Sequence, residues 1–226
     1  MPRVRGPAPN RPEGETAWPL LNERVFGAVD RGGNHTLPLP EAHELDLAAI
    51  FGRAAPVTYE IGFNRGRFLR ALAARWPDHD HLGVEIRRRY AWKVCQEMAG
   101  AGGPRNVRLL WADAKLVGPC FAPGRFAHVF INFPDPWWKR RHARRRLVDT
   151  DFASDLAARL APGGSVWVKS DVPAIADEIA AGLRACGSFD AEVEFSAEDL
   201  PPSYRESRCL KAGLPITRFR ATRRPG

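Results

Sequence analysis

One short stretch of the chain combines a carboxylate, aromatic rings and a block of positive charge. The apolar run 129–131 leads into Pro134-Asp135-Pro136, and the two prolines leave the backbone of Asp135 little freedom. Trp137 and Trp138 follow, and their flat faces could stack on a nucleobase. The cations that come next could hold a phosphate backbone, and they are Lys139, Arg140, Arg141, Arg144, Arg145 and Arg146.

Each part of this stretch also has an ordinary explanation. Pro-Asp-Pro alone is most often a turn, paired tryptophans are most often core, and a charge run is usually a solvated face. The functional interpretation depends on all three following one buried-looking strand. Together they predict a site where a nucleobase meets a fixed carboxylate beside a nucleic-acid-binding segment.

The elements that position this stretch form an alternating pattern. Runs typical of strands cover residues 57–61, 81–86, 106–111, 126–131, 165–169, 191–195 and 216–222, and 161–164 reads as a turn. Helical patterns cover 68–75, 88–99, 150–160 and 174–185, with a short one at 41–51. This alternation predicts an α/β fold, a parallel sheet covered on both faces by helices.

Acidic residues recur where four of the predicted strands end: Glu60, Glu85, Asp113 and Asp135. Ligands of such sheets bind beyond the carboxyl ends of the strands, at the point where strand order reverses. Any one of these acids could be a solvated strand end or a helix cap. As a set, they predict one crevice lined by carboxylates.

The loop after the first strand runs from Gly62 to Gly66 and lacks the G-x-G-x-x-G spacing of a dinucleotide site. Glu60 just before this loop would repel a pyrophosphate and suits a cationic or zwitterionic ligand. S-adenosylmethionine fits these requirements. Glu85 could then accept hydrogen bonds from the ribose, Asp113 from the adenine amino group, and Glu60 could lie near the amino acid head or sulfonium.

Composition limits the class of protein and its partners. The 226 residues, 44% of them hydrophobic, suit one globular domain, which we place at 18–226 behind a disordered basic leader at 1–17. A net charge of +8 favours a polyanionic partner, nucleic acid before a membrane surface.

The four cysteines form no C-x-x-C pair, so we expect free thiols and no metal site. No apolar run has the length of a signal or membrane segment, which favours a cytoplasmic protein, and a monomer is favoured in an otherwise open oligomeric state.

The sequence resembles the bacterial tRNA (guanine-N7)-methyltransferase family over about residues 57–220. The match is carried by the segments 60–66, 82–86, 113–114, 133–148, 170–171 and 217–219. The F-P-D-P-W-x-K-x-R-H pattern at 133–142 is its most specific part. The resemblance implies a Rossmann-like, doubly wound sheet of seven strands, mostly parallel with the last strand antiparallel, and tRNA as the partner.

The family's functional residues carry over to matching positions of this chain. The resemblance implies that Glu60, Glu85, Asp113 and Asp135 bind S-adenosylmethionine, with Asp135 in the active site. It also implies that the substrate contacts are Lys139, Asp171, Thr217, Arg218, Phe219 and Arg220.

Two positions depart from the family pattern. Asn64 stands where the loop usually has glycine, and asparagine tolerates a positive φ better than other non-glycine residues. Arg220 stands where the pattern T-x-F/Y-E has glutamate, and an arginine cannot accept hydrogen bonds from a guanine edge. Another carboxylate (Asp171 or Glu206) could read the base, base choice or activity could differ, or the last strand could be shifted so that Arg220 faces solvent.

The expected chemistry is an in-line displacement by guanine N7, whose lone pair carries no proton and needs no general base. Two other classes remain open from the residues alone. The first is a methyltransferase acting on a different base or on protein, because a pro-aromatic turn also serves amino groups. The second is a catalytically inert RNA-binding relative, which the departures at Asn64 and Arg220 would suit.

Overall fold

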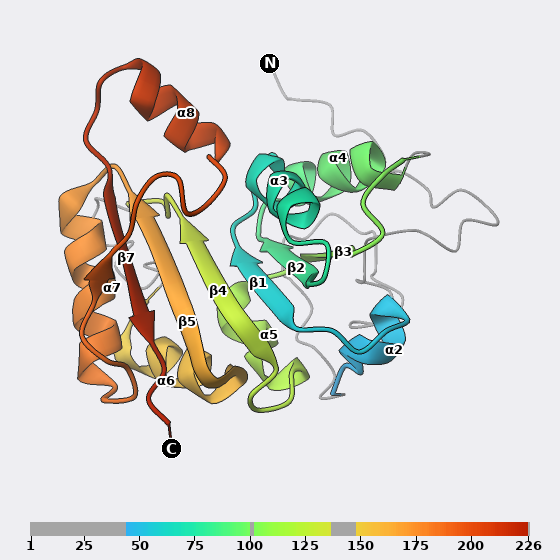
Figure 1. The fold of residues 1–226 in the computed structure, drawn as a ribbon, viewed down its shortest axis with the longest axis horizontal. Coiled ribbons are helices and arrows are strands. Elements are labelled where there is room, and N and C mark those ends of the chain that lie inside the picture. The colour runs from blue at the N-terminus through green and yellow to red at the C-terminus, as the bar shows by residue number, and fades with distance from the viewer. Residues whose placement is uncertain (1–43, 100–101, 137–147, 226) are drawn as a thin grey trace, which may run out of the picture.

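The computed structural model describes residues 44–99, 102–136 and 148–225, and the central feature of this part is one mixed sheet (Figure 1). The sheet has seven strands in the order β3-β2-β1-β4-β5-β7-β6. The strands are β1 Val57–Ile61, β2 Asp80–Glu85, β3 Val107–Trp111, β4 Phe126–Asn132, β5 Leu160–Ser170, β6 Val193–Glu194 and β7 Thr217–Thr222. The first five pair in parallel, and β7 is antiparallel to both β5 and β6. The predicted fold class, including the antiparallel last strand, is confirmed.

Helices cover both faces of the sheet. They are α2 Leu47–Phe51, α3 Arg67–Arg75, α4 Arg88–Ala99, α5 Ala114–Val117, α6 Thr150–Arg159, α7 Pro173–Ala185 and α8 Tyr204–Lys211, with a 3₁₀ turn η1 at Gly118–Cys120. We call the face packed against α3 and α4 the front face and the face packed against α6 and α7 the back face. Helix α8 stands beyond the carboxyl ends of β4 and β5 (Figure 1).

The back face holds the main apolar core. Strand residues such as Tyr59, Val129 and Val168 point to this face and pack with Leu156 of α6 and Ile179 of α7. Two smaller apolar clusters lie on the front face, one under α3 and α4 and one around Phe68, Leu72, Phe130 and Leu200. Because side chains alternate along each strand, every strand contributes to both faces.

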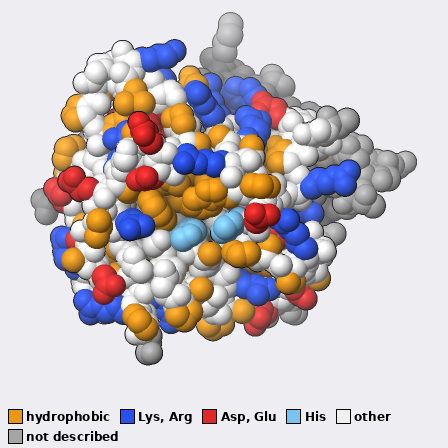
Figure 2. All heavy atoms as spheres, in the orientation of Figure 1, with side chains coloured by type: hydrophobic (Ala, Val, Ile, Leu, Met, Phe, Trp, Pro, Cys, Tyr) orange, Lys and Arg blue, Asp and Glu red, His pale blue; other side chains and the backbone are white. Residues whose placement is uncertain are grey.

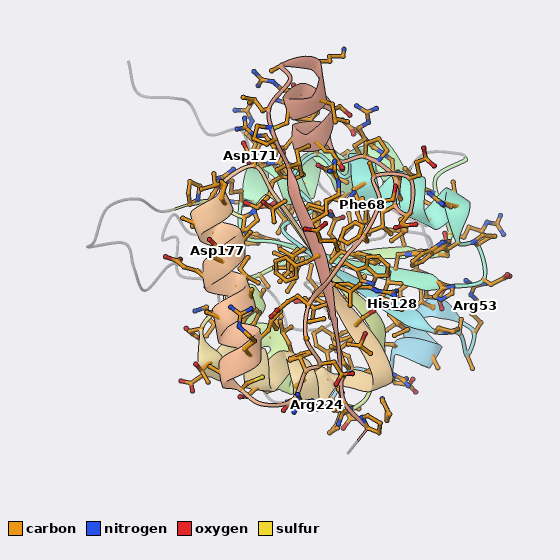
Figure 3. All side chains as sticks on the ribbon, turned by 60° about the vertical axis from the view of Figure 1, so that its left-hand side comes forward. Arg53, Phe68, His128, Asp171, Asp177 and Arg224 are labelled. Atoms are coloured by element: carbon orange, nitrogen blue, oxygen red, sulfur yellow. The ribbon has the colours of Figure 1, made fainter. Side chains whose placement is uncertain are left out.

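The front face also buries polar side chains. The strand residues among them are Thr58, Glu60, His81, Glu85, Ser165 and Lys169. Two of the contacts run between neighbouring strands, from Thr58 Oγ1 to His81 Nδ1 at 2.8 Å and from His128 Nδ1 to Ser165 Oγ at 3.0 Å. Figure 2 shows histidine side chains in the middle of this view, with hydrophobic side chains above and below them. Figure 3 shows Phe68 and His128 on the side of the sheet opposite Asp177, which lies on α7.

Most predicted element bounds agree with the structure to within two residues, but several elements differ. Helix α8 and the short α5 were not predicted, and the helix expected at 41–51 begins only at Leu47, after the N-cap Asp46. Strand β5 begins at Leu160, so the predicted turn at 161–164 is wrong; its pairing with β4 jumps from Leu160 to Ser165, which makes this part a bulge. Strand β6 has two residues instead of the expected five. The predicted leader at 1–17 lies outside the described residues.

None of the helices in the described ranges is long and apolar enough to span a membrane.

Candidate active site at the carboxyl ends of the strands

The loop between β1 and α3 is tightly curled because three of its residues have left-handed backbone angles. Gly62 has φ 77°, Asn64 φ 49° and Gly66 φ 63°, so Asn64 adopts the conformation that the glycine loop requires. A Cβ on Gly66 would lie 2.6 Å from Val94 Cγ1 of α4. The loop therefore needs glycine at Gly66 for both conformation and space, and α3 begins directly after it.

Glu85, at the end of β2, is buried and fastens two backbone segments. One carboxylate oxygen accepts a hydrogen bond from the Asn64 N–H at 2.9 Å and the other from the Arg87 N–H at 2.8 Å. Burial raises the pKa of Glu85, and these two hydrogen bonds oppose that shift. Glu85 thus fixes the glycine loop against the start of α4.

Glu60, at the end of β1, lies beneath the site and is only 2% exposed. Its Oε1 accepts a hydrogen bond from Asn132 Nδ2 at 3.0 Å, and its Oε2 has no hydrogen-bond partner among the described residues. Burial raises the pKa of Glu60 to about 8, against the hydrogen bond from Asn132. Below that pH Glu60 is mainly neutral, which lowers the cost of burying it.

Asp113, after β3, caps the short helix α5 and accepts a hydrogen bond from the Lys115 N–H at 3.0 Å. Two apolar side chains beside these acids are unusually exposed: Ile86, directly after Glu85, at 54% and Leu116 of α5 at 40%. They offer an apolar surface near the ends of neighbouring strands β2 and β3. Neither residue was predicted to belong to the site, although an isoleucine directly after a strand-end acid is a signal visible in the sequence.

The loop after β4 places Asp135 at the rim of the site. Phe133 has φ 53°, a strained angle for an aromatic residue, and its N–H donates to the Lys169 carbonyl at 2.7 Å. Asp135 is 48% exposed, and its Oδ2 forms an ion pair with the guanidinium of Arg87. The structure thus brings Asp135 and Glu85 to the same rim, and Arg87 connects to both. The role of Arg87 was not anticipated.

A fully buried ion pair anchors α8 beside this site. Lys169 Nζ lies 2.8 Å from Glu206 Oε2, and each side chain is 1% exposed. The other oxygen of Glu206 accepts a hydrogen bond from Arg218 at 2.9 Å. Ser203 and Glu206 form a capping box at the start of α8, so the S-x-x-E spacing was the signal for this helix. Asp171, at the end of β5, pairs with Arg205 of the same helix.

The remaining predicted substrate residues lie on different faces of β7. Thr217 is exposed opposite Ser170, at the carboxyl end of β5, and Arg218 binds Glu206. Phe219 is buried in the back-face core. Arg220 is exposed on the front face, where its guanidinium lies 5.2 Å from the centre of the Trp167 ring. The predicted stacking and phosphate-binding residues, Trp137 to Arg146, lie outside the described part of the chain.

Comparisons with known proteins agree with one another on the class of protein. A family model described as "Putative methyltransferase" matches residues 54–218. A protein of Synechococcus sp. (strain JA-3-3Ab) named tRNA (guanine-N(7)-)-methyltransferase is 39% identical over 83% of this chain and 80% of its own length. A protein of the same name from Aromatoleum aromaticum is 35% identical over 94% of this chain and 87% of its own length.

Solved structures share the fold at low sequence identity. The 16S rRNA methyltransferase KamB matches with a TM-score of 0.62 at 16% identity, over 81% of this chain and 95% of its own. A 16S rRNA (adenine(1408)-N(1))-methyltransferase variant from Catenulisporales acidiphilia, crystallised with cosubstrate SAM, matches with a TM-score of 0.58 at 17% identity, over 80% and 93% of the two chains. These likenesses establish the fold alone.

Proposed function

Because the chain belongs to the tRNA (guanine-N7)-methyltransferase family, we propose that it transfers a methyl group from S-adenosylmethionine to N7 of a guanine in tRNA. The observation that carries this proposal is the arrangement at the strand ends. A tightly curled glycine loop follows β1, and the acids Glu85 and Asp135 come from the strands on either side of it. Strand order reverses at this point, where ligands of such sheets bind.

The described residues fit S-adenosylmethionine, whose sulfonium supplies the methyl group. The exposed side chains of Ile86 and Leu116 offer an apolar surface for a flat base, and Glu85 and Asp113 stand beside them with carboxylates for ribose and adenine. Glu60 has a buried oxygen without a partner among the described residues, which a polar group of the bound cofactor can satisfy by hydrogen bonding. Gly62 and Gly66 allow close approach of the backbone.

The residues of the site act by orientation and charge. The N7 lone pair of guanine forms the new bond without losing a proton, so no side chain needs to act as a general base. Asp135 contributes a carboxylate at the rim, where it can orient the reacting groups and offset the positive charge that develops on the methylated purine.

We assign recognition of the guanine to the region where the carboxyl end of β5 meets α8 and the start of β7. Asp171, which binds Arg205 through Oδ2, is the carboxylate that we assign to the guanine edge. Glu206 is held on both oxygens by Lys169 and Arg218 and shapes this side of the site instead. We also assign substrate contacts to Thr217 and Arg218. The phosphates of the tRNA are assigned to Lys139 and the arginines at 140–146.

Arg220 does not need to read the base in this arrangement. It lies on Trp167 of the front face, and the opposing pair Arg220 and Trp167 sits in the middle of the β5–β7 pairing instead of at its carboxyl end. We therefore assign Arg220 to electrostatic attraction of the RNA. We propose that the protein acts on tRNA in the cytoplasm as a monomer.

The first test is a methyl-transfer assay with labelled S-adenosylmethionine and unmodified tRNA, with products mapped by cleavage selective for N7-methylguanosine. We expect one labelled guanosine, cleavage at that position and loss of most turnover in Asp135→Ala without loss of fold. Label in another nucleotide would contradict the N7 assignment. Cofactor binding without any transfer would favour the inert RNA-binding relative.

A further inference from the structure

The side chain of Asp135 depends on a neighbour from another strand. Its backbone is fixed by Pro134, Pro136 and the left-handed Phe133. Its carboxylate is half exposed, and the ion pair with Arg87 is what holds it among the described residues. Glu85, in contrast, is held by two backbone N–H groups. A fixed backbone alone leaves the carboxylate free to rotate, so Arg87 supplies the missing constraint.

Arg87 is itself well anchored. Its N–H donates to Glu85 Oε1 at 2.8 Å, and its carbonyl accepts from the Tyr90 N–H at 2.9 Å as α4 begins. Its guanidinium lies 6.0 Å from the centre of the Tyr90 ring. The residue that binds Asp135 therefore starts from a rigid part of the fold, the same part that Glu85 ties to the glycine loop.

The pair also has a defined place relative to the crevice. Strand β1 lies between β2 and β4 in the sheet, so the contact from Arg87 to Asp135 passes across the end of β1, where the glycine loop starts. Arg87 contacts Oδ2, and among the described residues no hydrogen bond is made to Oδ1. One oxygen is thus taken by arginine while the other is left for a different donor.

We propose that Arg87 is a positioning residue for the methyl-transfer reaction, which holds Oδ2 of Asp135 so that Oδ1 is presented to the reacting groups. This inference rests on the proposed function and adds a residue that neither the sequence motifs nor the family resemblance assigned. Arg87 acts through Asp135 and has no separate role. Removing Arg87 leaves the Asp135 carboxylate in the site but free to rotate. The rate of methyl transfer should then fall because the carboxylate is no longer held in one orientation.

The test compares Arg87→Ala and Arg87→Lys with Arg89→Ala, a matched control. Arg89 is an equally charged, exposed residue two positions further along, and it forms no ion pair within the described residues. We expect Arg87→Ala to lower the single-turnover rate on tRNA about tenfold, with a much smaller change in the KM for cofactor. Arg87→Lys keeps one charged donor and should recover part of that loss, and Arg89→Ala should retain the unmodified rate.

A binding measurement gives a second readout that does not depend on turnover. S-adenosylmethionine carries a sulfonium and S-adenosylhomocysteine does not, so an oriented Asp135 favours the former. The dissociation constant of S-adenosylhomocysteine divided by that of S-adenosylmethionine measures this preference. The ratio should fall about threefold in Arg87→Ala and stay unchanged in Arg89→Ala. In an Asp135→Asn background, Arg87→Ala should change neither the rate nor this ratio any further.

The possible failures separate the two proposals. No transfer by the unmodified protein would end the proposed function, and this inference with it. Normal transfer in Arg87→Ala, or a further loss in the Asp135→Asn background, would overturn only the role of Arg87. Tighter cofactor binding in Arg87→Ala would also overturn it, because Arg87 would then compete with the ligand for Asp135.

Discussion

The back face of the sheet packs Val129, Ile131, Val166 and Val168 against apolar helices, whereas on the front face β1 buries Glu60 and β5 buries Lys169. Both faces are equally dry at these positions, so burial alone does not distinguish them. What differs is the requirement placed on each side chain. An apolar side chain needs only matching shape, but a buried charge needs a partner or a shifted pKa.

This difference has a functional meaning, because the front face leads to the site. Lys169, Glu60 and Glu85 lie at or near the carboxyl ends of their strands, and the groups that hold them come from the glycine loop, α8 and the last residue of β4. The back-face core is almost entirely apolar and supplies stability through packing. The front face carries charges that a ligand can perturb.

The largest expected effect comes from breaking the buried ion pair on the front face. Lys169→Met leaves Glu206 buried with only Arg218 and local backbone as partners, and we expect a loss of about 3–5 kcal/mol in the free energy of unfolding. Urea denaturation measures this loss. The control is Arg205→Ala, which breaks the more exposed pair with Asp171 and should cost at most about 1 kcal/mol. Equal losses in the two variants would contradict the distinction.

A cavity on the back face should affect stability without affecting the chemistry. Leu156→Ala removes a fully packed side chain of α6 and should cost about 3 kcal/mol of unfolding free energy. Because Leu156 lies in the back-face core, on the opposite side of the sheet from Glu60 and Glu85, the rate of methyl transfer per folded molecule should stay unchanged at a temperature where the variant is folded. A rate loss comparable to that of Asp135→Ala would show that the faces are coupled.

Glu60 predicts a pH dependence of stability. Its pKa rises on folding from an ordinary value of 4.5 to about 8, mainly by burial, with Glu85 raising it and Asn132 and Lys169 opposing. The folded state therefore binds the proton more tightly, and stability present below about pH 4.5 is lost as pH rises to about 8. Glu60→Gln should flatten this decline and be about 2 kcal/mol more stable than the parent at pH 8. Urea denaturation of both proteins at pH 5 and pH 8 measures the effect. An equal change in unfolding free energy between the two pH values in both proteins would refute it.

The smallest effect concerns His128, further from the site. Burial lowers its pKa from 6.5 to about 4, with His79 and Arg220 adding to the shift. The unfolded chain then binds more protons, so this contribution to stability is lost as pH falls from about 6.5 to 4. His128→Gln should reduce the acid sensitivity by about 1 kcal/mol, seen as a smaller drop in melting temperature between pH 7 and 5. His81 carries a similar shift and should keep part of the dependence.

Sequence patterns predicted the five parallel strands well, because each contains a recognisable apolar run and is bounded by turn residues. β1 and α4 were predicted with their observed bounds. Helix α8 was missed because its buried face carries Glu206 and Cys209, whereas Leu210 is exposed, so the apolar residues do not mark the buried side. Its stability comes from Glu206 bound to Lys169, a contact 37 residues apart that no local pattern reveals.

For the candidate site, the sequence predicted which strand ends carry acids better than it predicted the surroundings of each acid. The four strand-end acids were expected to line one crevice together. Asp135 and Glu85 do reach the same rim, but Glu60 is covered and Asp113 caps α5. Spacing tells which strand ends carry acids, whereas burial depends on what the loops and helices place over them. Arg87 was overlooked for the same reason, since its partner lies 48 residues away.

The place of β7 in the sheet has a consequence for biosynthesis. β7 follows the other strands in the chain, yet it lies between β5 and β6 and pairs with β5 from Ser165 to Ser170. While the protein is being made, the edge of β5 stays open until residues 217–222 have left the ribosome, and an open apolar edge invites pairing with other chains. The nascent chain therefore has a late vulnerable period, which chaperones that shield strand edges would be expected to cover.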